Sequence, residues 1–429
     1  MKARQGTETG EPEVVRAASE RLEEAVGLAL AIELEVVHSI IAPIANLRPA
    51  TLFGTGKVEE IAGIVSAMEA GLVIVDHALT PIQQRNLEKA WNAKVLDRTG
   101  LILEIFGRRA ATKEGTLQVE LAHLNYQRGR LVRSWTHLER QRGGAGFLGG
   151  PGETQIEADR RILRDKIKSL ENELEQVRRT RSLHRAKRKK VPLPIIAFVG
   201  YTNAGKSTLF NRITGAEVVA KDMLFATLDP TLRRIKLAGG TQAVLSDTVG
   251  FVSDLPTHLV AAFRATLEEV READIIVHVH DVSHSQAAAQ ANDVDVVMAD
   301  LGIEGERADA VIHVWNKIDL LPAENRDMIV GRAERDENAV ALSAITGEGI
   351  DSFLTLVEER ISGTLVRRRV SLPPSRFADV AWLYENGIVD SRQVTDDGTM
   401  IVDVRVTHDT DQFMASHLPA GSVSTLKAS

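Results

Sequence analysis

The segment from Pro194 to Asn211 constrains the fold of this chain more than any other stretch. Apolar residues lead into Gly200, the sequence from there to Ser207 reads GYTNAGKS, and a helical periodicity follows. A strand, a G-x-x-x-x-G-K-S loop and a helix in this order predict a site whose backbone N–H groups and helix N-terminus face a phosphate. Lys206 would reach the β- and γ-phosphates, and the Ser207 hydroxyl would bind Mg²⁺. The alternative interpretation is an ordinary glycine-rich turn.

Three further motifs follow predicted strands, at the edge where open α/β sheets bind ligands. The segment 247–250 (DTVG) offers a carboxylate that can hold magnesium through water and the Gly250 N–H for a γ-phosphate. The segment 316–319 (NKID) ends in Asp319, whose carboxylate can accept from N1–H and the exocyclic amine of guanine. The Ala344 N–H is placed to donate to guanine O6. Adenine lacks both guanine donors, so the motifs predict GTP rather than ATP.

Composition places limits on the class of protein. The 429 residues suffice for roughly three domains of about 150 residues each, and 44% hydrophobic with 26% charged residues is usual for soluble globular proteins. The polar segment Met1–Val14 is not a signal peptide, and no apolar run approaches the roughly 20 residues that span a bilayer. The absence of Cys excludes disulfides and thiol-based sites. We therefore expect a cytoplasmic protein without stable membrane insertion.

The pattern of apolar residues and turns divides the chain into five parts. We expect a disordered tail at 1–20, an N-terminal α/β domain at 21–115, a basic antiparallel coiled-coil hairpin at 116–192, a nucleotide domain at 193–365 and a small C-terminal domain at 366–429. In the C-terminal domain, strand signals at 387–390 and 400–406 flank a turn, and the surface offers no evident site.

The N-terminal domain is predicted to hold a small, mostly parallel sheet, because strand and helix patterns alternate. Strands are expected at 35–40, 51–53, 72–76 and 94–97, and helices at 58–69 and 81–91. Thr80 is the expected N-cap of the second helix, directly before Pro81. The segment 54–57 (GTGK) lies at a strand–helix turn and is either a second nucleotide contact or a plain tight turn.

The hairpin is predicted from two heptad repeats joined by a short loop. The repeats are Leu117, Leu124, Leu131 and Leu138, then Ile156, Leu163, Leu170 and Val177. The joining loop, 143–152, has six Gly among ten residues and presents Phe147 and Leu148, and apolar residues at a tip rarely face water without a partner. We expect this tip to probe nucleic acid, the alternative being a disordered hairpin end.

Charge supports RNA as the partner of this hairpin. Residues 128–190 hold 18 Lys and Arg against 8 Asp and Glu, a net charge of +10, whereas the whole chain has −7, so the remainder carries −17. Basic side chains neutralise phosphates, and an aromatic tip can stack on unpaired bases. The alternative is a solvated charged helix face. The predicted RNA contacts are Arg140, Arg142, Phe147, Leu148, Arg160 and Arg161, and we expect no DNA binding.

The chain resembles the HflX family of translation-factor-like P-loop GTPases. The similarity rests on residues 52–57, 143–155, 200–207, 225–229, 247–251 and 316–319. It implies a doubly wound α/β GTPase sheet, preceded by a small α/β domain and an antiparallel helical hairpin and followed by a small α+β domain. It also implies a GTP hydrolase that binds the large ribosomal subunit and splits or rescues stalled ribosomes.

The resemblance also supplies roles for individual residues. Thr227 would join Ser207 as a magnesium ligand, with Thr231 as the alternative, and Lys206, Thr227 and Gly250 would be the catalytic residues. Asn203 is similar to the asparagine that holds K⁺ in potassium-stimulated GTPases, or else serves only in loop hydrogen bonds. The predicted nucleotide contacts are Gly200, Tyr201, Thr202, Asn203, Ala204, Gly205, Lys206, Ser207, Thr208, Phe225, Ala226, Thr227, Leu228, Asp229, Asp247, Thr248, Val249, Gly250, Asn316, Lys317, Ile318, Asp319, Ser343, Ala344 and Ile345.

Phe251 leaves the mechanism open. Many GTPases carry at this position a glutamine that orients the attacking water, and a phenyl ring cannot do so. We therefore expect slow intrinsic GTP hydrolysis that ribosomes stimulate. We also expect the protein to be a monomer. The alternatives are an RNA-binding or chaperone module that uses GTP as a structural ligand, and a GTPase that serves tRNA modification.

Overall fold

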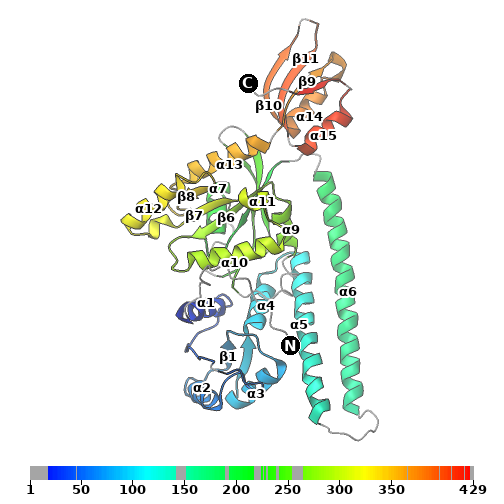
Figure 1. Cartoon of the computed structure of the whole chain (residues 1–429). Helices are drawn as coiled ribbons and strands as arrows, with labels where there is room; N and C mark the ends of the chain where they lie inside the picture. The colour runs from blue at the N-terminus through cyan, green and yellow to red at the C-terminus, as the bar shows by residue number, and fades with distance from the viewer. Residues whose placement is uncertain are drawn as a thin grey trace, which may run out of the picture.

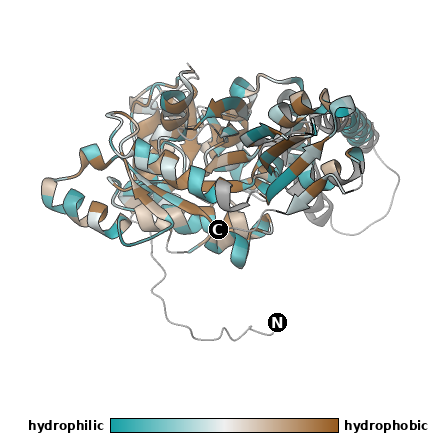
Figure 2. Cartoon of the chain, turned by 90° about the horizontal axis from the view of Figure 1, so that it is seen from above, coloured by the Kyte–Doolittle hydropathy of each residue, from teal (hydrophilic) through white to brown (hydrophobic). Residues whose placement is uncertain are grey.

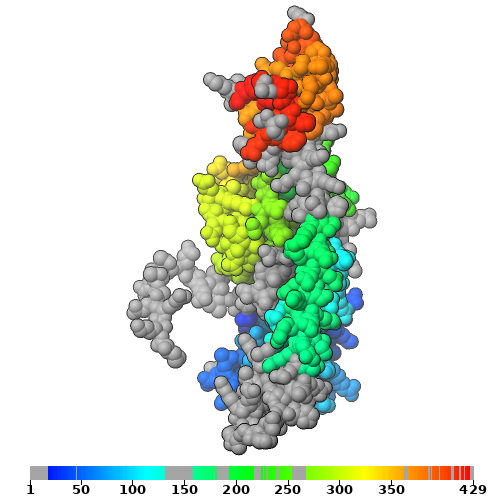
Figure 3. Space-filling view, turned by 90° about the vertical axis from the view of Figure 1, so that its right-hand side faces the viewer, coloured from blue at the N-terminus to red at the C-terminus, as the bar shows by residue number. Residues whose placement is uncertain are grey.

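The structure is a computed structural model. It describes residues 18–44, 46–141, 151–188, 193–216, 224–225, 227–228, 230–237, 241–253, 264–364, 366–395, 397–406, 408–419 and 421–425. An N-terminal unit, a central domain and a C-terminal unit follow one another along the long axis of the molecule, and a helical hairpin runs beside the first two (Figure 1). Figure 3 shows this hairpin along one side of the molecule, past the N-terminal unit.

The central domain is built on a six-stranded sheet in the order β4-β5-β3-β6-β7-β8, in which only the β4–β5 pair is antiparallel. The strands are β3 (Ile195–Val199), β4 (Thr231–Lys236), β5 (Gln242–Asp247), β6 (Ile275–Asp281), β7 (Ile312–Asn316) and β8 (Ala339–Ala341). The helices are α7 (Lys206–Thr214), α9 (Arg264–Glu272), α10 (Ala287–Asp300), α11 (Glu306–Asp309), α12 (Ala323–Ala333) and α13 (Ile350–Thr364), with the 3-10 helix η2 (Ile318–Leu320).

Helices cover both faces of this sheet, which confirms the doubly wound fold. Leu209 and Phe210 of α7 pack with Phe353 of α13 in one hydrophobic cluster. Leu267 of α9 and Val294 of α10 belong to a second cluster on the other face. Burying each such side chain contributes about 1.5–3 kcal/mol, so the two clusters hold the sheet between its helices. Figure 2, which views the molecule from above, shows hydrophobic and hydrophilic residues interspersed along the helices and strands.

The N-terminal unit comprises α1 (Ala18–Leu30), α2 (Thr55–Ala67), β1 (Leu72–Val75), α3 (Pro81–Trp91), β2 (Lys94–Asp97) and α4 (Arg98–Arg109). Its sheet is the parallel pair β1–β2. The predicted cap is confirmed: the Thr80 side chain accepts from the Gln83 N–H, and the Gln83 side chain accepts from the Thr80 N–H, which satisfies N–H groups that a helix end leaves unpaired.

Two of the strands predicted for this unit were wrong. Residues 35–40 and 51–53 are not strands, and the described part of the segment forms only an isolated bridge between Arg48 and Leu52. The apolar residues Val36 and Val37 lie exposed rather than facing a neighbouring strand. The predicted tail also ends too late, because residues 18–20 already belong to α1, whereas residues 1–17 lie outside the described part of the chain.

The N-terminal unit and the central domain share one hydrophobic core. Phe106 of α4 is fully buried, and its ring meets that of Phe225 edge to face at a centroid distance of 4.9 Å. Leu28 of α1, Val119 and Phe251 belong to the same cluster. Because Phe225 and Phe251 flank the predicted nucleotide site, the N-terminal unit packs directly against the loops of that site.

The predicted hairpin is formed by α5 (Lys113–Gln141) and α6 (Pro151–Arg188). Heptad residues make its seam: Leu117, Leu124, Ile167, Leu170 and Leu174 are buried together. Residues 142–150, and with them Arg142, Phe147 and Leu148 of the predicted RNA contacts, lie outside the described residues, as does the side chain of Arg140. Arg160 is half-buried and Arg161 is exposed.

The C-terminal unit is an α+β fold. Its antiparallel sheet has the order β10-β11-β9-β12. The elements are β9 (Val366–Leu372), the 3-10 helix η3 (Pro374–Arg376), α14 (Asp379–Asn386), β10 (Ile388–Val394), β11 (Met400–Val406), α15 (His408–His417) and β12 (Val423–Thr425). Leu383 and Met414 pack on Val370 and Val402 of the sheet. Within the described part of the chain, the helices are all too short or too polar to cross a membrane.

Candidate nucleotide site

The phosphate-binding loop joins the end of β3 to the start of α7. Gly200 has a φ of 148°, and a Cβ built on it would lie 2.3 Å from the carbonyl oxygen of Val279 on β6. Only glycine, which has no Cβ, therefore allows the start of the loop to lie this close to β6. Asn203 also takes a left-handed conformation, with a φ of 62°, and is exposed. Thr208 continues the loop into the first turn of α7.

Lys206 lies inside this loop. Its side chain is 5% exposed, and Nζ donates to the carbonyl oxygens of Gly200 at 3.0 Å and Tyr201 at 2.8 Å. Burial lowers the pKa of Lys206 to about 8, although Asp247 opposes the fall. A phosphate beside the ammonium would restore the favourable charge environment that burial removes.

Three oxygen atoms converge beyond the loop. Ser207 Oγ lies 2.7 Å from Asp247 Oδ2 and 2.9 Å from Thr227 Oγ1, and Thr227 Oγ1 lies 3.0 Å from the same Asp247 oxygen. Neighbouring ligands of octahedral Mg²⁺, at about 2.1 Å from the ion, are about 2.9 Å apart. The donor set therefore fits magnesium. Thr231, the alternative to Thr227, begins β4 opposite Asp247 in the strand register.

The surroundings of Asp247 give a second indication that this site suits a cation. It is fully buried, and its Oδ1 has no hydrogen-bond partner among the described residues. Burial raises the pKa of Asp247, while hydrogen bonds from Ser207 and Thr227 and the charge of Lys206 oppose the rise. A buried carboxylate oxygen without a partner is costly, and a bound cation or its water would relieve that cost.

The loop after β5 lies against the phosphate loop. A Cβ at Gly250 would lie 2.7 Å from Thr202 Cα and 3.0 Å from Lys206 Nζ, so this approach requires glycine. The Thr202 N–H donates to the Phe251 carbonyl at 2.7 Å, and the Phe251 N–H donates to the Gly200 carbonyl at 3.1 Å. The Phe251 ring is 3% exposed and lies in the shared core.

The predicted guanine contacts meet at the ends of β7 and β8. The Asn316 side chain donates to the Ala204 carbonyl and accepts from the Ala344 N–H, both at 2.9 Å, so it joins the phosphate loop to the loop after β8. Lys317 forms an ion pair with Asp281 at 2.6 Å. The remaining members of this group also lie here: Ile318 and Asp319 form part of η2, Ser343 is buried, and Ile345 is exposed.

Some of the other predicted contacts lie in the core, and two lie outside the described residues. Val249 and Leu228 are buried, and the Thr248 hydroxyl donates to the Phe198 carbonyl. Ala226 and Asp229 lie outside the described residues. Thr227 reaches Ser207 because Phe225, two residues earlier, is anchored in the shared core at a positive φ of 56°, a conformation that is strained for a bulky residue.

A polar clamp that was not predicted from the sequence holds the same loops. We define it as Glu24 of α1, Arg98 of α4, Tyr201 and Ser253. Glu24 accepts from the Tyr201 hydroxyl and pairs with Arg98, and the Ser253 hydroxyl donates to Glu24 at 3.0 Å. Arg98 donates to the Ser253 carbonyl at 2.9 Å. Burial alone would raise the pKa of Glu24, but Arg98 and Tyr201 outweigh it and lower that pKa.

The predicted contact between the Asp319 carboxylate and guanine can be tested with Asp319→Asn. An amide can accept one hydrogen bond from guanine but repels the second donor, and each charge-assisted bond contributes about 1.5–3 kcal/mol. We expect GDP affinity to fall about 100-fold, while xanthosine diphosphate, whose 2-oxo group suits an amide donor, binds more tightly than to the wild type. Calorimetric titration measures both, with exposed Asp327→Asn as the control. Unchanged GDP affinity would place the base elsewhere.

The buried lysine predicts a pH effect on nucleotide binding. Its pKa is about 8 without nucleotide, and neighbouring phosphates would raise it. The number of protons taken up per GDP bound should therefore be close to zero near pH 7 and about 0.9 near pH 9. The affinity for GDP should fall as the pH rises above 8. Calorimetry in buffers of different ionisation enthalpy measures the uptake. Lys206→Arg, which stays protonated, should abolish it. Equal uptake by both proteins would contradict the assignment.

Comparison with known proteins agrees with this geometry. Four family models match in succession: GTP-binding GTPase N-terminal at 19–107, GTP-binding GTPase middle region at 109–188, 50S ribosome-binding GTPase at 195–317 and HflX C-terminal domain at 328–425.

Individual relatives match over nearly the whole chain. GTPase HflX of Magnetococcus marinus is 49% identical over 399 residues, 92% of this chain and 90% of that protein. GTPase HflX of Escherichia coli is 45% identical over 388 residues, 90% of each. A solved GTP-binding protein from Sulfolobus solfataricus in complex with GDP is 22% identical, with a TM-score of 0.44, covering 80% of this chain and 96% of that one. From the family models and the two close relatives, the chain belongs to the HflX family of GTPases.

Proposed function

We propose that this GTPase binds the large ribosomal subunit through its basic hairpin, splits or rescues ribosomes, and hydrolyses GTP rapidly only when docked. The proposal rests on one combination of features. The phosphate site has the buried ring of Phe251 where many GTPases carry a glutamine, and the same chain has a long basic hairpin, α5–α6. The match to the family described as 50S ribosome-binding GTPase supports the choice of partner.

The residues around the phosphates would bind and orient GTP rather than exchange protons with it. Lys206 would neutralise the β- and γ-phosphates, and the Gly250 N–H would contact the γ-phosphate. Ser207 and Thr227 would hold Mg²⁺, which supplies positive charge against the phosphate oxygens. Loss of the γ-phosphate would then release the loops of Thr227 and Gly250 together.

Slow intrinsic turnover follows from Phe251. Its backbone is hydrogen-bonded to the phosphate loop, and its ring is buried toward the N-terminal unit. The ring can neither orient water nor stabilise charge. The attacking water must then be positioned by backbone groups and by the partner, and a group that completes a GTPase site from outside can accelerate hydrolysis by about 10³–10⁵.

Exposed charge on α6 supports RNA binding. Arg161, Arg164 and Lys168 are exposed and follow one another at helical spacing, on the face opposite the buried seam of Ile167 and Leu170. They lie in the half of α6 that is nearer the tip. Each phosphate that such a residue neutralises contributes about 0.7–0.9 to the slope of log affinity against log salt.

A continuous set of contacts links the phosphate site to the middle of helix α5 in this hairpin. The loop of Thr227 contains Phe225, whose ring packs on Phe106 of α4. The N-cap of α4, Asp97, accepts from the Tyr126 hydroxyl of α5 at 2.6 Å. Arg130 of α5 also pairs with Asp97, at 3.3 Å. We propose that release of the Thr227 loop shifts α4 and, through Asp97, the hairpin.

The test is phosphate release and subunit binding by Arg161→Ser/Arg164→Ser/Lys168→Ser. Large subunits should stimulate the wild-type protein at least tenfold. The triple variant should keep its intrinsic rate and GDP affinity, lose most of the stimulation, and bind subunits with a salt slope smaller by about 2–3. Arg85→Ser/Lys89→Ser/Lys94→Ser removes the same charge from exposed sites in the N-terminal unit and should behave as the wild type.

Other outcomes would contradict the proposal in distinguishable ways. Equal turnover with and without subunits would favour GTP as a structural ligand. Stimulation that survives in the hairpin variant would move the docking surface elsewhere. If the triple variant lost affinity for GDP as well as for the subunit, the hairpin would be a structural support for the nucleotide site.

A second cofactor, K⁺, is proposed at Asn203. The left-handed backbone leaves this side chain exposed at the phosphate loop. We expect GTP turnover in K⁺ to exceed that in Na⁺ severalfold, and Asn203→Gly, which accepts the same backbone, to abolish the difference. Equal turnover of the wild type in the two salts would leave Asn203 with loop hydrogen bonding only.

A further inference from the structure

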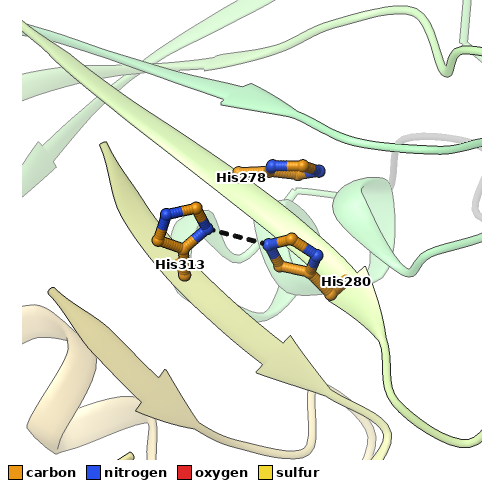
Figure 4. Close-up of side chains that lie close together, drawn as sticks. All are labelled: His278, His280 and His313. Carbon is orange, nitrogen blue, oxygen red and sulfur yellow. Dashed lines mark hydrogen bonds between the residues drawn. The ribbon is translucent and has the colours of Figure 1, made fainter. Parts of the chain in front are cut away.

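Three histidines gather on the central sheet, outside the nucleotide contacts. His278 and His280 lie two residues apart on β6 and so face the same side of the sheet, and His313 pairs with His278 in the register of β6 and β7 (Figure 4). Each ring offers one nitrogen, and these nitrogens lie within 4.8 Å of one another. His280 Nε2 and His313 Nδ1 are 3.0 Å apart.

Burial disfavours the charged form of these imidazoles, and the neutral form is the one that binds metals. His278 is 1% exposed, and burial lowers its pKa. Burial also lowers the pKa of His280 to about 2, helped by its two neighbours, and lowers that of His313. A neutral imidazole presents an unshared electron pair on one nitrogen. His280 and His313 are only partly buried, which leaves a route for an ion.

One of these rings also lacks a good partner. His278 Nδ1 is buried and has no hydrogen bond that meets ordinary geometry among the described residues. A carboxylate oxygen of Asp295 on α10 lies 3.5 Å from it. Histidine ligands of metals usually donate their second N–H to a carboxylate, which orients the ring and strengthens the ligand. Asp295 is placed to do this for His278 once the ring turns slightly.

We propose that His278, His280 and His313 form a binding site for a divalent transition metal of the zinc class, with a solvent oxygen as fourth ligand. Two nitrogen ligands of tetrahedral zinc are about 3.3 Å apart, close to the His280–His313 separation. The rings of His278 and His280 have centroids 3.8 Å apart and are tilted by 31°, so they would have to turn for one nitrogen of each to face the ion. Imidazole ligands separate this site from the all-oxygen magnesium site.

A metal bound to the three histidines would affect the structure of the sheet because of where these residues lie. His280 directly precedes Asp281, the ion-pair partner of Lys317, and β7 carries His313 three residues before Asn316. A metal bound to both strands would join β6 to β7 beneath the guanine-contact loop. We therefore expect metal binding to raise the melting temperature of the GDP-bound protein without displacing Mg²⁺ or GDP.

The experiment uses the full chain without a polyhistidine tag, loaded with Mg²⁺ and GDP. Titration with Zn²⁺ should show about one tight equivalent, and Co²⁺ should develop the visible absorption of a tetrahedral nitrogen site. His280→Gln and His313→Gln should each lose the absorption and weaken Zn²⁺ binding at least tenfold. Exposed His38→Gln is the matched control and should bind as the wild type. Asp295→Asn should weaken binding about tenfold while keeping the absorption.

Retained GDP binding and an unchanged melting temperature without metal show that a variant is folded. If His280→Gln does not fold, His313→Gln, at a half-buried position, decides the question. Absence of Co²⁺ absorption in the wild type would make the trio a neutral packing cluster. Equal Zn²⁺ affinity in the wild type and both cluster variants would overturn the proposal as well.

Discussion

The shared core between α4 and the nucleotide loops is the constraint on which the rest of the molecule depends. Phe225 holds a left-handed backbone that costs about 1–3 kcal/mol, and burial of its ring against Phe106 offsets that cost. The same arrangement carries Thr227 to Ser207 and Asp247. The packing of the N-terminal unit therefore supports the placement of Thr227 in the phosphate site, through a hydrophobic core that the unit shares with the central domain.

The polar clamp adds specificity to this packing. Glu24 and Arg98 are taken out of water between the N-terminal unit and the central domain, so their attraction must first offset desolvation. Removing one partner of such a pair typically costs about 3–5 kcal/mol, because the other charge stays buried. Tyr201 and Ser253 bind the same carboxylate, and each lies in a loop around the phosphates. A misaligned domain contact would leave these groups unpaired, which selects one relative placement of the unit and the domain.

Local features could be predicted from the sequence, and long-range ones could not. The strand–loop–helix order of β3 and α7, the Thr80 cap and the heptad seam all depend on residues a few positions apart. Glu24 and Arg98 are 74 positions apart, and Glu24 and Ser253 are 229, so no periodicity signals their contact. The three histidines meet through the pairing of β6 with β7. The strand predicted at 35–40 was wrong because β-branched residues such as Val36, Val37 and Ile40 favour an extended backbone but do not supply a neighbouring strand.

The length of the hairpin has a mechanical consequence. The 38 residues of α6 extend about 57 Å as a straight helix, while α5 is tied to Asp97 near its middle by Tyr126 and Arg130. A rotation of about 5° about one end of a helix of this length would carry its other end through about 5 Å, close to the rise of one helical turn. The length of the hairpin thus means that a small change of angle at one end of α6 corresponds to a displacement of several ångströms at the other.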